Sequence, residues 1–120
     1  MPRSDDTNIR INASVKPIRF LGTTREDLAQ LPEAARRRAG HELFLVQTGR
    51  EPADFKPMPS IGVGVCEIRI RVQPGAFRVI YVAAFAEAIY VLHVFRKTTA
   101  KTSRLDLELA SRRLRSLGDR

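Results

Sequence analysis

The 120 residues contain one cysteine, two histidines and no tryptophan, and they contain no long apolar run. Cys66 has no second cysteine to pair with, so an internal disulfide is excluded, which fits a reducing compartment. One cysteine and two histidines also cannot supply the four ligands of the common structural zinc sites. No stretch approaches the roughly 18 apolar residues of a membrane helix, and the first residues lack the apolar segment of a secretory signal. These absences predict a cytoplasmic protein.

Acidic residues are few relative to basic ones. Lys and Arg number 21 against 13 Asp and Glu, which gives a net charge of +8. Residues 61–120 carry most of this excess, with 11 basic and 5 acidic residues. A basic half is typical of proteins that bind an anionic partner, most often a nucleic acid. Charge alone leaves open the alternative that the excess arginine only keeps the protein soluble.

The hydrophobic pattern predicts one α+β domain over residues 16–120, preceded by a flexible N-terminal extension over residues 1–15. Ile9 and Ile11 could form a short edge strand within that extension. A strand is expected over 16–21, followed by a helix that Thr24 opens and a second helix over 33–48. The second helix has apolar residues at helical spacing, namely Ala35, Ala39, Leu43 and Val46.

The second half of the chain changes to a period of two. Residues 50–60 hold three prolines and predict an irregular loop, after which strands are expected over 65–72, 77–85 and 88–95. A turn at 73–76 and another at 86–87 would join these strands into two hairpins. Ser103 is expected to cap a final helix over 103–117.

Side chains that alternate along these strands divide the expected sheet into two faces. If Gln73 pairs with Ala76, Arg71 lies opposite Arg78; if Phe85 pairs with Ala88, Arg78 lies opposite Phe95. One face would then be polar and open, with Glu67, Arg69, Arg71, Arg78, His93, Phe95 and Lys97. The other would be the core that the helices cover, with Ile68, Ile70, Val72, Phe77, Val79, Tyr81, Ala83, Tyr90, Leu92 and Val94.

The polar face has the residue types that an RNA backbone needs. Arginine forks match phosphate oxygens, and a histidine or lysine can take the proton from a 2′-hydroxyl. Phe95 offers a surface on which a base could stack. The alternative is a merely solvated sheet face with a structural histidine. On an open face, Arg78→Ala should change stability by about 1 kcal/mol at most.

The strings Glu67-Ile68-Arg69, Phe77-Arg78-Val79-Ile80-Tyr81 and His93-Val94-Phe95-Arg96-Lys97-Thr98, followed by Lys101-Thr102, resemble a known family. They are similar in combination to HigB-like toxins of the RelE/ParE superfamily, in its phage-derived branch. The resemblance covers about residues 15–118. It implies a twisted antiparallel sheet with an N-terminal helical hairpin and a C-terminal helix.

The resemblance also implies a function. RelE- and HigB-type members cut mRNA in the ribosomal A site, and a helix-turn-helix antitoxin blocks HigB-type members. The family's functional basic residues correspond to Arg69, Arg78 and Lys97. RelE-type toxins often place a catalytic tyrosine in the C-terminal segment, but this chain has no tyrosine after Tyr90. The identity of the general base is therefore left open.

The first hypothesis is therefore a toxin that cuts mRNA on the ribosome and uses no metal or other cofactor. Arg69 and Arg78 would bind the phosphate, Lys97 would stabilise charge or assist proton transfer, and His93 would be the base or acid. Additional RNA contacts are expected from Arg71, Phe95, Lys101 and Arg104. The alternatives are a ParE-like inhibitor of DNA gyrase and a degenerate toxin that only binds its antitoxin. The fold does not decide between them.

Overall fold

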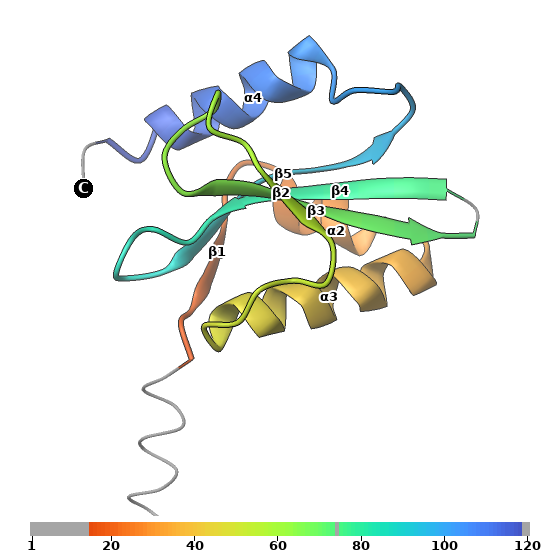
Figure 1. Ribbon diagram of the computed structural model, residues 1–120, viewed down its shortest axis with the longest axis horizontal. Coiled ribbons are helices and arrows are strands. Elements are labelled where there is room, and N and C mark those ends of the chain that lie inside the picture. The colour runs from red at the N-terminus through yellow and green to blue at the C-terminus, as the bar shows by residue number, and fades with distance from the viewer. Residues whose placement is uncertain (1–14, 74, 119–120) are drawn as a thin grey trace, which may run out of the picture.

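The computed structural model describes residues 15–73 and 75–118, in which helices cover both faces of a five-stranded sheet (Figure 1). The strands are β1 (Ile18–Phe20), β2 (Phe55–Pro57), β3 (Val65–Val72), β4 (Gly75–Val82) and β5 (Ile89–Lys97). The helices are α2 (Thr24–Ala29), α3 (Glu33–Gln47) and α4 (Arg104–Arg115). This is the α+β fold that the sequence predicts.

The sheet is mixed, in the order β1-β5-β4-β3-β2. The two expected hairpins, β3–β4 and β4–β5, form its antiparallel centre. The expected antiparallel strands are present, and β1 joins them at the edge by pairing parallel to β5. The expectation that residues 50–60 lack regular structure is wrong. Lys56 pairs with Glu67 in the short edge strand β2, whose proline is tolerated at a sheet edge.

The helical hairpin forms as its apolar spacing predicts. All four residues of the expected stripe on α3 are buried, namely Ala35, Ala39, Leu43 and Val46. Gly49 follows α3 with φ of 85°, a left-handed conformation that favours glycine and ends the helix. Helix α2 begins at Thr24, as expected, but Thr24 does not occupy the N-cap position. Thr23 holds that position, and Thr24 is fully buried in the first turn.

Both faces of the sheet are covered, which differs from the expected open polar face. In Figure 1, α3 lies below the sheet and α4 above it. Residues of α3 pack with Ile68, Ile70, Phe77 and Val79 on one side. On the other side Ala110 and Leu107 of α4 pack with Ile80 and Leu92. Helix α4 therefore encloses part of the face that carries the arginines.

The pairing of the strands corrects two details of the predicted sheet. Val72 pairs with Gly75, so Arg78 lies opposite Arg69, whereas the sequence argument places it opposite Arg71. This shift by two residues keeps every side chain of the hairpin on its predicted face. Between β4 and β5 the predicted pairing is confirmed from Ala76 to Ile80, and it includes the pair of Arg78 with Phe95.

A β-bulge between Ile80 and Tyr81 changes the register beyond that point. Tyr90 and Leu92 consequently pack on the α4 side of the sheet rather than with α3, as the sequence argument expects. Tyr81 stays in the α3-side core, as expected. Because a bulge places one extra residue on a strand, it reverses the faces that follow it.

In the part of the chain that the structure describes, no helix combines the length and the apolar character needed to cross a membrane. The expected N-terminal extension and the edge strand at Ile9 and Ile11 lie outside the described residues, apart from Val15. They stay predictions.

Candidate functional site: a basic pocket between the sheet and the start of α4

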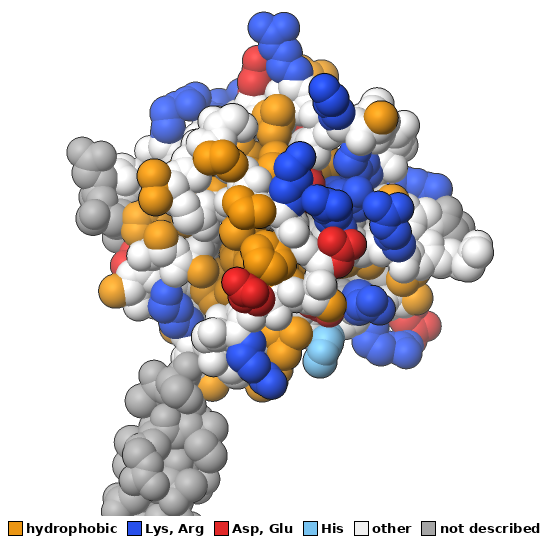
Figure 2. Space-filling model, in the orientation of Figure 1, with side chains coloured by type: hydrophobic (Ala, Val, Ile, Leu, Met, Phe, Trp, Pro, Cys, Tyr) orange, Lys and Arg blue, Asp and Glu red, His pale blue; other side chains and the backbone are white. Residues whose placement is uncertain are grey.

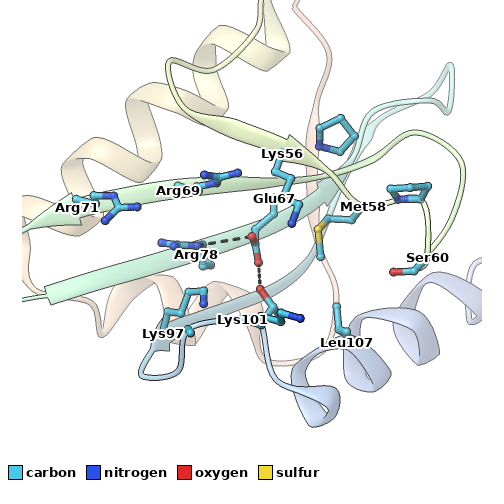
Figure 3. Close-up of a pocket in the computed structure, with 14 residues that line it drawn as sticks. Lys56, Met58, Ser60, Glu67, Arg69, Arg71, Arg78, Lys97, Lys101 and Leu107 are labelled. Carbon is cyan, nitrogen blue, oxygen red and sulfur yellow. Dashed lines mark hydrogen bonds and ion pairs between the residues drawn. The ribbon is translucent and has the colours of Figure 1, made fainter.

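A pocket of about 450 Å³ opens where β2, β3 and β4 meet the connection from β5 to α4 (Figure 3). Side chains of all these elements point into it. Its lining consists of Lys56, Pro57, Met58, Pro59, Ser60, Glu67, Arg69, Arg71, Arg78, Lys97, Ala100, Lys101, Thr102 and Leu107. We call this cavity the basic pocket.

Positive charge dominates the basic pocket. Among the described residues, six cationic side chains line it against a single carboxylate, that of Glu67. The cations are Lys56, Arg69, Arg71, Arg78, Lys97 and Lys101. Figure 2 shows Lys and Arg side chains gathered on one half of this face of the molecule. Such a concentration of one sign in a concave site attracts anions.

Two of these arginines lie directly opposite each other on neighbouring strands, Arg69 on β3 and Arg78 on β4. Like charges in this position destabilise a sheet. Nearby acids compensate in part. The Nε atom of Arg78 lies 3.6 Å from Glu67 Oε1, and that of Arg69 lies 3.9 Å from Asp54 Oδ1. Both distances exceed that of a hydrogen bond, so these side chains attract each other by charge, while the backbone N–H of Arg69 donates a 2.9 Å hydrogen bond to Asp54 O.

Burial makes the Arg78 charge costly. Arg78 is 5% exposed and its Nη1 donates a 3.0 Å hydrogen bond to its neighbour's carbonyl, Phe77 O. Burial lowers the pKa of the guanidinium below its usual value, the charge of Glu67 opposes that shift, and the charges of Arg71 and Arg69 add to it. The group stays charged at neutral pH, because arginine does not lose its proton there. An anion that enters the pocket would relieve this unfavourable charge.

Glu67 ties the sheet to the connection that precedes α4. The residue is 3% exposed, and Thr102 Oγ1 donates a 2.5 Å hydrogen bond to Glu67 Oε2. Lys97, the last residue of β5, donates a 2.6 Å hydrogen bond from its Nζ to Thr99 O of this connection, which also carries Lys101. A dashed line in Figure 3 marks the ion pair between Glu67 and Arg78. The two lysines are thus held near the paired arginines.

The structure brings five of the eight expected site residues together. They are Arg69, Arg71, Arg78, Lys97 and Lys101, and all line the basic pocket. The premise that Arg78 sits on an open face is wrong, because its side chain is buried. For a buried charge of this kind we expect Arg78→Ala to cost more than the roughly 1 kcal/mol that an open face predicts.

His93, Phe95 and Arg104 do not line the pocket. His93 is buried under α4, where its Nε2 lies 2.7 Å from Asp106 Oδ1. The ring of Phe95 stacks on His93 at a centroid distance of 4.5 Å, so that face is already occupied. Arg104 pairs with Glu108 at 3.4 Å on the exposed side of α4.

Sequence reasoning missed several lining residues, chiefly Lys56, Ser60, Thr102 and Leu107. Lys56 enters the pocket because β2 pairs with β3, and three prolines in residues 50–60 concealed that strand. The one indication in the sequence was the position of Lys56 between two prolines, Pro52 and Pro57. Glu67 was placed on the correct face but without a role. No group of three His, Cys, Asp or Glu side chains among the described residues is arranged to hold a metal ion.

The model of the family described as "Phage derived protein Gp49-like (DUF891)" matches residues 26–115, three-quarters of the chain. This chain belongs to the Gp49-like family. The family is one of RelE/ParE-like toxins, so the resemblance drawn from the sequence is confirmed at that level. The match spans every residue that lines the basic pocket of this Gp49-like protein. A search of the curated proteins found no match.

Proposed function

We propose that this Gp49-like protein is the toxin of a type II toxin–antitoxin system and a HigB-type endoribonuclease that cuts mRNA on the ribosome. The observation that carries the proposal is the basic pocket, with six cations around a single buried carboxylate. The contacts of the opposed arginines to Glu67 and Asp54 are longer than hydrogen bonds. A phosphodiester would supply closer anionic oxygens, which arginine binds with two parallel hydrogen bonds. Membership of a RelE/ParE-like toxin family supports the same reading.

The reaction that fits this pocket is attack by a ribose 2′-oxygen on the adjacent phosphorus. The bond from the 2′-oxygen to phosphorus forms while the bond to the 5′-oxygen of the next nucleotide breaks. The products are a 2′,3′-cyclic phosphate and a free 5′-hydroxyl group. Arg69 and Arg78 would stabilise the charge that develops on the non-bridging oxygens. One group must remove the 2′-proton, and another must protonate the leaving oxygen.

Glu67 is better placed than His93 for the first of these roles. Its carboxylate lines the pocket, whereas His93 contacts Asp106 beneath α4. We assign Glu67 to accept the 2′-proton, and the ammonium group of Lys97 to give a proton to the leaving 5′-oxygen. The Thr102 hydroxyl would orient the carboxylate through its hydrogen bond to Oε2. Arg71 and Lys101 would bind flanking phosphates.

The proposed partners are mRNA on the ribosome and an antitoxin with a helix-turn-helix domain. The basic pocket gives the antitoxin a simple means of inhibition, since an acidic segment seated there would exclude RNA. We place the protein in the cytoplasm, where these partners are found.

The test uses purified protein with ribosomes that carry a defined mRNA. Wild-type protein should cut the mRNA and leave 2′,3′-cyclic phosphate ends, while Glu67→Gln should bind RNA but cut it at least about 100-fold more slowly. The matched control replaces Arg36 and Arg37 of α3 by Gln, because both are exposed and distant in sequence from the pocket. Intact mRNA together with poisoned gyrase would overturn the proposal in favour of a ParE-like toxin.

A further inference from the structure

A second hollow adjoins the basic pocket on the outer side of α4. It has a volume of about 510 Å³ and lies between α4 and the loop that follows β2. Its lining consists of Ser60, Ile61, Arg104, Leu107, Glu108, Ser111, Arg112 and Arg115. We call it the α4 groove. Ser60 and Leu107 line both cavities, so the basic pocket continues into the α4 groove.

The charge of the α4 groove is also positive. Three arginines line it against the single carboxylate of Glu108, which pairs with Arg104 at 3.4 Å. Arg112 and Arg115 are three residues apart, so they lie on the same side of the helix. Both side chains are exposed, and neither has a side-chain hydrogen bond or ion pair to any other described residue. The guanidinium groups of Arg112 and Arg115 can therefore bind an anion at the end of the groove farther from the basic pocket.

We infer that a single strand of RNA leaves the basic pocket across Ser60 and Leu107 and follows the α4 groove, where Arg112 and Arg115 bind its phosphates. The inference rests on the proposed function and extends its substrate beyond the reacting phosphate. Leu107 and Arg115 are eight residues apart, which is about 12 Å along a helix axis. That length accommodates more than one nucleotide.

The chemistry of the groove favours a nucleic-acid backbone over a protein segment. Its lining holds no aromatic side chain on which bases could stack and only two large apolar residues, Ile61 and Leu107. Protein interfaces have an apolar, often aromatic, centre, and this groove offers none of that kind. Serines and arginines are typical phosphate contacts, which position a strand without reading its sequence. RNA binding in the α4 groove should therefore not depend on the base sequence of the RNA.

The experiment measures the affinity of the full chain for single-stranded RNA of two lengths, a 3-mer and a 12-mer. Both carry 2′-O-methyl groups so that no cleavage occurs. The proteins are wild type, the groove variant Arg112→Gln with Arg115→Gln, the pocket variant Arg69→Gln with Lys97→Gln, and the control Arg36→Gln with Arg37→Gln. Each variant removes two positive charges, and circular dichroism verifies that each is folded.

The groove variant should bind the 12-mer about tenfold more weakly and the 3-mer as wild type does. Its slope of log affinity against log salt for the 12-mer should be shallower by about 1.4, or about 0.7 for each lost phosphate contact. The pocket variant should weaken both lengths, and the control should change neither.

A groove variant that binds the 12-mer as tightly as wild type overturns this inference and leaves the groove to an acidic protein partner. An equal loss in the control overturns it as well, because the effect would then be one of net charge. If the pocket variant binds the 3-mer normally, the proposed function fails, whatever the groove variant does.

Discussion

Arg78 and Glu67 form an ion pair in the lining of the basic pocket. Both side chains are buried, their charges lie 3.6 Å apart, and a second arginine stands opposite Arg78 across the sheet. Two hydrophobic residues would serve stability at least as well at such positions. The pair also lines a cavity that is surrounded by cationic side chains. Its position is therefore better explained by binding of an anion than by stability.

Replacing Arg78 by Met should lower the free energy of unfolding by about 3 kcal/mol, because the Glu67 carboxylate then stays buried without its partner. The double variant with Glu67→Gln should recover part of that loss, with a coupling energy of at least about 0.5 kcal/mol. Urea denaturation measures both quantities. A loss below about 1 kcal/mol would mean that water solvates Arg78 as on an ordinary open sheet face.

Cys66 and Tyr81 predict how stability depends on alkaline pH. Burial raises the pKa of the Cys66 thiol above its usual 9.0, and burial together with Cys66 raises the pKa of Tyr81 above its usual 10.0. As the pH rises, the unfolded chain loses these protons first, so the stability present below about pH 9 should decrease between about pH 9 and 11.

The variant Tyr81→Phe lacks one of the two titrating groups. Its free energy of unfolding should therefore decrease less than that of wild type over the same pH range, as measured by urea denaturation at fixed pH steps. Parallel curves for the two proteins would show that Tyr81 titrates alike in the folded and unfolded chains.

At the scale of single elements, the start of α4 decides the shape of the site. Ser103 caps the helix, since its Oγ accepts a 3.1 Å hydrogen bond from Asp106 N and donates a 2.7 Å bond to Asp106 Oδ2. The other oxygen of Asp106 contacts His93 on β5. This chain of contacts fixes α4 to the sheet and so forms one wall of the basic pocket.

Ser103→Ala should cost about 1 kcal/mol of stability, the usual value for a lost N-terminal cap, whereas Ser103→Asn should retain most of it. Thermal and urea denaturation of the two variants give the comparison. Equal losses in both variants would indicate that the hydroxyl contact to Asp106 matters rather than the cap itself.

His93→Leu separates a structural histidine from a chemical one. Loss of the contact to Asp106 should lower stability by about 1 to 3 kcal/mol. At a temperature where the variant is fully folded, RNA cleavage should equal that of wild type, because His93 does not line the pocket. Abolished cleavage in a folded variant would return His93 to the role of general base.

At the scale of the whole molecule, the charge is divided unevenly, and the fold concentrates it. Residues 61–120 hold 11 of the 21 basic residues and only 5 of the 13 acidic ones. The strands and the connection to α4 gather five of these basic residues around one cavity, with Lys56 added from β2. Long-range attraction should therefore bring anionic partners to this side of the protein.

The association rate with a single-stranded RNA 12-mer should fall steeply between about 0.1 M and 1 M salt, where the screening length shortens from about 10 Å to about 3 Å. The dissociation rate should change less, because steering acts mainly on encounter. Stopped-flow fluorescence at several salt concentrations separates the two rates. An association rate that does not respond to salt would make the net charge of +8 a solubility feature only.

Much of the fold follows from the sequence by itself, because side-chain periodicity is a local property. The stripe on α3, the glycine after it, the Ser103 cap and the alternation of β3 and β4 all depend on neighbours within a few residues. The same local alternation placed Arg69, Arg71, Arg78 and Lys97 on one face, and the motifs indicated the toxin family.

Contacts between distant parts of the chain were decided only by the tertiary structure. The bulge at Ile80 and Tyr81 moved Tyr90 and Leu92 to the other face, because one extra residue reverses a strand's alternation. The packing of α4 buried His93 against Asp106 and removed it from the site. Pairing of β2 with β3 added Lys56. None of these contacts leaves a periodic mark in the sequence, since each depends on which surfaces meet when the chain folds.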